Sequence, residues 1–204
     1  MKALLVVGSA PRALADLAAA KRLYPDAEVM LVNGACTMVE AAQHMVAGHT
    51  VKANQFVAAR DKAFPLAGPI RVHANTLVKH RRDYEIAYPV VTDWWGPEMS
   101  SGATSAGKAA LIGLAMGFGP VVLCGCPMDG SGYDLNEAVV PHDRACARVG
   151  HAAAQGKRMV LSYQEKMASL AATVFKGKVF SMSGYTREHL GSPPAWGQQM
   201  DWLS

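Results

Sequence analysis

The chain has no CxxC pair among its four cysteines, no long hydrophobic run and little excess of charge of either sign. Without paired cysteines or another metal-ligand signature, a metal site is not indicated. Without an apolar run of about 20 residues, no membrane-spanning helix is expected. A net charge of +4 spread over 204 residues does not indicate a nucleic-acid surface. These absences leave an ordinary globular protein as the class to consider.

Half of the residues are hydrophobic, which at this length is enough for one globular domain with a substantial core. Cys124 and Cys126 lie two residues apart in a predicted strand, so they point to one face, where a mutual disulfide would be strained. We therefore expect a reduced, cytoplasmic setting. The apolar run at residues 3–7 is too short for the core of a signal peptide and predicts a buried first strand.

Apolar runs of strand length alternate with helical stretches along the chain. This alternation predicts an α/β fold: a single-domain, Rossmann-like, mostly parallel sheet with helices on both faces. The expected strands are residues 3–7, 28–32, 51–58, 70–73, 88–92, 120–126 and 179–182. The expected helices are residues 12–23, 37–47, 76–84, 104–118 and 159–175.

Residues 100–133 combine a small polar loop, an Ala/Gly-rich helix, an apolar strand and a second loop rich in Gly and Asp. Gly102, Gly107 and Lys108 match part of a phosphate-binding P-loop, but Ala109 stands where a Ser or Thr hydroxyl should reach Mg²⁺. We interpret the match as an ordinary helix start. Lys108 is then expected on the solvated helix surface, where it contributes little to nucleotide affinity.

Three predicted strands end in small or amide residues, as a backbone-lined cleft at the carboxyl edge of a sheet requires. Glycine permits close approach of a ligand, and an Asn amide can recognise a base or a ribose. A helix start beside this edge favours a phosphorylated ligand. The candidate nucleotide-binding residues are Gly8, Ser9, Ala10, Asn33, Ser100, Ser101, Gly102, Gly125 and Asp129.

At these positions the chain resembles the bacterial sialyltransferases that use a CMP-activated sugar, together with related variant-Rossmann proteins. Residues 8–11, Gly-Ser-Ala-Pro, are similar to the family's early Gly-Asn-Gly-Pro loop. Residues 32–34 resemble its Cys-Asn-Gln, and residues 100–102 resemble its Thr-Ser-Gly. Residues 114–129 are similar to the family's A-x-x-L-G-[FY]-x-x-[IV]-x-L-x-G-x-D pattern, with the aspartate two residues later.

The resemblance implies glycosyl transfer from a nucleotide-activated, CMP-linked sugar. It places a histidine base between the Gly/Asp loop and the long helix, where His151 is preferred and His142 is the alternative. Tyr133 is the candidate donor to the departing phosphate. No cofactor is required for this chemistry.

Two other functions stay open. Some proteins of this fold transfer pyrophosphate to a pterin alcohol, and such an enzyme would need Mg²⁺ held by carboxylates. A nucleotide-binding module without catalysis would need only the loops. The expected partner in every case is a nucleotide or a nucleotide-sugar. The aromatic segment 193–202 either docks on a partner subunit, giving a homo-oligomer, or covers the chain's own core.

Overall fold

The computed structural model of the protein describes residues 1–75, 81–102, 104–128 and 154–195. Within these residues, seven strands form one sheet in the order β5-β4-β3-β2-β1-β6-β7, and every neighbouring pair is parallel. The strands are β1 Leu4–Val7, β2 Glu28–Val32, β3 His44–Ala47, β4 Arg71–Asn75, β5 Asp93–Trp95, β6 Val121–Cys124 and β7 Val179–Ser181.

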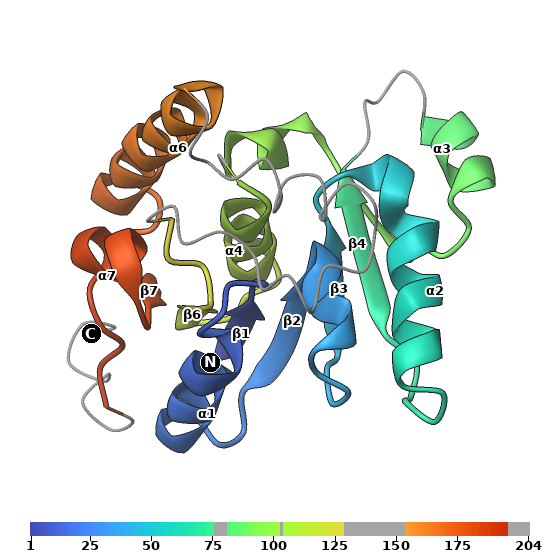
Figure 1. Ribbon diagram of the computed structural model, residues 1–204, viewed down its shortest axis with the longest axis horizontal. Coiled ribbons are helices and arrows are strands. Elements are labelled where there is room, and N and C mark those ends of the chain that lie inside the picture. The colour runs from blue at the N-terminus through green and yellow to red at the C-terminus, as the bar shows by residue number, and fades with distance from the viewer. Residues whose placement is uncertain (76–80, 103, 129–153, 196–204) are drawn as a thin grey trace.

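The order of the strands creates one reversal in the sheet. From β1 to β5 the chain steps outward in one direction, and it then crosses back to place β6 and β7 on the other side of β1 (Figure 1). In open parallel sheets, ligands collect outside the carboxyl ends of the strands at such a reversal. The topology therefore predicts a ligand site at the loops that follow β1 and β6.

Helices cover both faces of the sheet (Figure 1). The α-helices are α1 Ala13–Leu23, α2 Ala53–Ala63, α3 Arg81–Ala87, α4 Ser105–Ala115, α6 Ala154–Ala172 and α7 Gly184–Leu190. Short 3-10 segments are η1 Asn33–Thr37, η2 Thr50–Lys52 and η4 Pro97–Gly102.

Each face of the sheet has its own apolar core, because successive strand residues point to opposite sides. Leu5 and Val7 of β1 pack with α1 and α2, whereas Leu4 and Val6 pack with α4 and with Met167 of α6. The predicted Rossmann-like α/β fold, with a parallel sheet between two helical layers, is confirmed. Among the described residues, no helix has the length and apolar character needed to cross a bilayer.

The expected helix at residues 37–47 is wrong. Its first part is the end of η1, and its last four residues are strand β3, buried along its whole length. A strand buried on both faces shows no alternation of polar and apolar residues, so a short apolar run of this kind is ambiguous between helix and strand.

The expected strand at residues 51–58 is also wrong, because this segment contains η2 and the start of α2. Ala53, Phe56 and Arg60 are the buried residues of α2, and their spacing of three and four is that of one helix face. The strand expected at residues 88–92 begins later, as β5 Asp93–Trp95. The strand expected at residues 28–32 has the bounds of β2, and the other expected elements are present with shifted ends. Residues 76–80 of the third expected helix lie outside the described chain.

Candidate functional site

The loops after β1 and β6 pack directly on each other at the reversal of the sheet. The N–H of Gly8 donates to the Cys124 carbonyl over 2.9 Å, and the N–H of Ala10 donates to the Gly125 carbonyl over 3.3 Å. A Cβ atom on Gly8 would lie 2.5 Å from the Gly125 carbonyl oxygen. The structure thus brings Gly8, Ala10 and Gly125 together, with half-buried Ser9 between them. The glycines are needed here for contact between two loops.

A buried carboxylate that sequence reasoning missed holds this loop pair in place. Asp16 of α1 is 4% exposed, and its Oδ2 atom accepts hydrogen bonds from the Gly125 N–H at 2.9 Å and from the Ser183 hydroxyl at 2.5 Å. A carboxylate that accepts two hydrogen bonds can be buried at an acceptable free energy. Asp16 therefore links α1, the end of β6 and the start of α7. In the sequence it is indistinguishable from any acidic residue in a first helical turn.

Asn33 connects the ends of two strands to the start of α4. Its Oδ1 atom accepts from the Gly48 N–H at 2.8 Å, and its Nδ2 group donates to the Ser105 hydroxyl at 3.1 Å. Because the Gly48 N–H can only donate, this contact fixes which way the Asn33 amide is turned. Asn33 also has a positive φ of 50°, a conformation that Asn tolerates better than most residues. Its amide is engaged within the protein, so Asn33 positions its neighbours.

The start of α4 is capped from within. The Thr104 hydroxyl accepts from the Gly107 N–H at 3.1 Å, and the Lys108 N–H donates to the Thr104 carbonyl at 2.9 Å. Gly102 packs its backbone against Gly107, where a Cβ atom on either residue would clash with the other segment. A P-loop presents these N–H groups to phosphate, whereas here they are occupied. Among the described contacts, Thr104 accepts no hydrogen bond from the other two N–H groups of this turn, those of Ser105 and Ala106.

Lys108 lies in the first turn of α4, close to Gly48, and the expectation of a solvated lysine is wrong. The side chain is half-buried, and its ammonium group approaches the Gly48 carbonyl at 3.4 Å. Lys108 therefore lies beside Gly48, which in turn contacts Asn33 and Ser105. The positive end of α4 and a lysine together favour an anion at this place. We call Asn33, Gly48, Ser105 and Lys108 the edge cluster.

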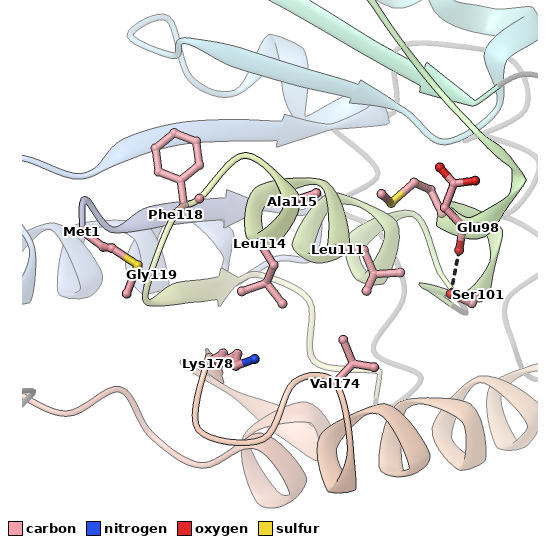
Figure 2. A pocket seen from close by; sticks show the side chains of 12 residues that line it. Met1, Glu98, Ser101, Leu111, Leu114, Ala115, Phe118, Gly119, Val174 and Lys178 are labelled. Carbon is pink, nitrogen blue, oxygen red and sulfur yellow. Dashed lines mark hydrogen bonds between the residues drawn. The ribbon is translucent and has the colours of Figure 1, made fainter. Parts of the chain in front are cut away.

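Of the three residues predicted from the Thr-Ser-Gly resemblance, Ser101 and Gly102 lie in different surroundings. The Ser101 hydroxyl donates to the Glu98 carbonyl at 2.8 Å, and Ser101 lines a cavity of about 610 Å³ along the outer side of α4 (Figure 2). Gly102 instead packs on Gly107, inside the α4 start. Ser100 lies in the same segment, η4. The cavity lined by Ser101 contains none of the edge-cluster residues.

The candidate catalytic residues Tyr133, His142 and His151 lie outside the described residues, as does Asp129. Their predicted roles stay predictions. Within the part of the chain that the structure describes, no three His, Cys, Asp or Glu side chains gather as a metal site.

The described cysteines do not provide a reactive thiol. Cys36, Cys124 and Cys126 are buried and form no disulfide with one another. Burial raises the pKa of Cys126 to about 12, and burial followed by the neighbouring Cys126 and Asp16 raises the pKa of Cys124. Since the thiolate is the nucleophile, Cys124 and Cys126 are structural residues.

A row of polar side chains crosses the α4 side of the sheet from β2 to β5, and sequence reasoning missed it entirely. Trp95 Nε1 donates to His73 Nδ1 at 3.1 Å, His73 Nε2 lies 3.1 Å from His44 Nδ1, and His44 Nε2 lies 2.7 Å from Glu28 Oε2. His44 and His73 are 3% and 0% exposed. We call these four residues the histidine chain.

The histidine chain has a direction. An indole N–H can only donate, so His73 Nδ1 must accept and its Nε2 must carry the hydrogen in the neutral ring. His73 then donates to His44, and His44 donates to the Glu28 carboxylate. Each neutral ring is satisfied on both nitrogens, which explains how two histidines can be buried in a sheet.

Burial favours the neutral form of His73. Burial is the largest cause that lowers the pKa of His73, to about 4, although Asp93 opposes it. Burial acts to raise the pKa of Glu28, but hydrogen bonds from His44 and Lys2 outweigh it and hold that pKa below its usual range. The signal in the sequence was a polar residue at the first or third position of four strands. That signal becomes readable only once the register is known.

Comparison with known proteins returns no significant match, either to a family model, to a curated protein or to a solved structure. The resemblance to sialyltransferases therefore stays a prediction from short motifs.

Proposed function

We propose that the protein binds a nucleotide-activated sugar, CMP-linked, at the carboxyl edge of the sheet and transfers its glycosyl group. The observation that carries the proposal is the edge cluster, in which Asn33 joins the ends of β2 and β3 to the positive end of α4. Asn33 is also the residue that the resemblance assigns to the nucleotide site.

The edge cluster suits a phosphate. The Ser105 N–H lies at the start of an 11-residue helix, and Lys108 adds a positive charge one turn later. A phosphate oxygen near Ser105 would lie close to both the positive end of α4 and the Lys108 ammonium group. Asn33 supports this site by holding Ser105 and Gly48, since both ends of its amide are occupied.

The proposed reaction transfers the glycosyl group from the nucleotide phosphate to an acceptor hydroxyl. The acceptor hydroxyl loses its proton to a histidine base, its oxygen forms a bond to the sugar's anomeric carbon, and the bond from that carbon to the phosphate oxygen breaks. The leaving nucleotide carries away the electron pair, so negative charge grows on its phosphate. The positive end of α4 and Lys108 would stabilise this charge. His151, or alternatively His142, is the proposed base.

Turnover of a CMP-linked sugar, measured as CMP release with and without EDTA, tests the proposal. We expect activity that survives EDTA, and a drop in kcat of on the order of 10² to 10⁴ in His151→Ala with little change in CMP affinity. His142→Ala is the matched control. If His142→Ala alone abolishes turnover, the base is His142. Turnover that requires Mg²⁺ and ATP would instead indicate pyrophosphate transfer, and nucleotide binding without any turnover would indicate a binding module.

A further inference from the structure

Helix α4 is apolar on both of its sides. Ala109, Ala110 and Ile112 face the sheet and are fully buried, whereas Leu111 and Leu114 lie on the outer side and are only partly covered. A helix that is apolar all round normally has apolar cover on every side. We therefore expect an apolar group to cover the outer side of α4.

The outer side of α4 forms one wall of the cavity of about 610 Å³ described above, which we call the α4 cavity. Figure 2 shows Leu111 and Leu114 on this wall, with Val174 and Lys178 across the hollow from them. Met1 and Phe118 close one end of it. This volume lies within the range of about 300 to 1,000 Å³ that is usual for small-molecule sites, and its mainly apolar wall fits that class.

The polar residues of the α4 cavity stand in two places. At one place, Ser101 donates to the Glu98 carbonyl, and the Glu98 carboxylate folds back against the Gly96 backbone. At the other, Lys178 is exposed, and no described carboxylate lies within ion-pair distance of its ammonium group. Figure 2 shows Lys178 on the same side of the hollow as Val174, across from Leu114. The cavity thus offers an apolar body site with the Lys178 cation at one place and the Glu98 carboxylate at the other.

We propose that the α4 cavity binds an amphipathic carboxylate, with the apolar body along Leu111 and Leu114 and the carboxylate on Lys178. Burial of an apolar chain supplies most of the affinity. The lysine selects the sign of the head group. The proposal is independent of nucleotide transfer, because the cavity and the edge cluster share no residue.

Titration calorimetry with decanoate, decanol and decylamine tests this inference. We expect decanoate to bind about fivefold more tightly than decanol, and decylamine to bind most weakly, as suits one partly exposed ion pair. Lys178→Gln should weaken decanoate binding about fivefold and leave decanol unchanged. Lys176→Gln, which removes another exposed lysine outside the cavity, should change neither. Leu114→Trp should fill the cavity and abolish binding of all three probes.

Equal decanoate affinity in Lys178→Gln and the unmodified protein would overturn the proposal, as would the absence of saturable binding by any probe. Sedimentation velocity adds a second way to overturn it. A dimer that dissociates in Leu114→Arg would assign the apolar side of α4 to a second copy of this chain.

Discussion

The edge cluster and the histidine chain both place polar groups beside the same sheet, but they satisfy them differently. In the edge cluster, Asn33 and Lys108 each contact Gly48, a backbone segment at the carboxyl end of a strand. In the histidine chain, each contact joins one side chain to the next, in the order Trp95, His73, His44 and Glu28. The first arrangement lies at the start of a helix, whereas the second runs through the sheet and ends on Glu28, which pairs with the exposed Lys2.

This difference separates a binding role from a structural one. A network whose donors and acceptors are already paired specifies how the strands align. A cluster at a helix start keeps a positive end that a ligand can use. We therefore expect substitutions in the histidine chain to change stability, and substitutions in the edge cluster to change affinity.

The largest expected effect is that of His73→Phe on stability. The phenyl ring fills the space but leaves the Trp95 N–H and His44 Nδ1 without their partners, at about 1 to 3 kcal/mol for each buried group. Urea unfolding should show a loss of about 3 kcal/mol. His189→Phe, a change at an exposed histidine that stacks on Tyr185, should change stability by less than about 0.5 kcal/mol.

The same variant should also flatten the pH dependence of stability. The pKa of His73 is about 4 in the folded protein, below the ordinary 6.5, so between these values the unfolded chain binds more protons. Stability therefore falls as the pH drops from 6.5 to 4, by on the order of 3 kcal/mol. His73→Phe should lose most of this slope. An unchanged slope would mean that the histidine chain does not bury a neutral His73.

The substitution Gly8→Ala tests whether Gly8 serves loop packing or ligand contact at the reversal of the sheet. The added methyl group meets the Gly125 carbonyl oxygen at 2.5 Å and Cys126 Sγ at 2.7 Å. Such overpacking should lower the free energy of unfolding by about 1 to 3 kcal/mol. Gly68→Ala is the matched control, because a Cβ atom there meets nothing within 4 Å. If Gly8→Ala instead keeps its stability and loses nucleotide affinity, Gly8 contacts the ligand directly.

The fold class was predictable because buried parallel strands and amphipathic helices leave separate patterns in the sequence. Residues 28–32 show this clearly, since an apolar run between polar flanks is β2. The pattern fails at β3, where a four-residue buried strand follows η1 without a strand signature. It also fails at α2, where Ala53, Phe56 and Arg60 have a helical spacing although the apolar run at residues 51–58 predicts a strand.

The candidate site was predictable in part. Asn33 and the α4 start follow from rules about strand ends and helix starts, which act locally. Asp16 and the His44–His73 contact depend on segments far apart in the chain, so no local pattern reveals them. The position of Lys108 beside Gly48 likewise needs the register of β3 against α4.

The most direct test of the edge cluster is the difference in affinity between CMP and cytidine, measured by titration calorimetry in the unmodified protein, Lys108→Met and Lys62→Met. A phosphate held by the α4 start and Lys108 should make CMP at least about tenfold tighter than cytidine, equivalent to about 1.4 kcal/mol. Lys108→Met should remove most of that difference, whereas Lys62→Met, at an exposed position of α2, should keep it. Equal affinity for CMP and cytidine in the unmodified protein, or an undiminished difference in Lys108→Met, would contradict the proposed site.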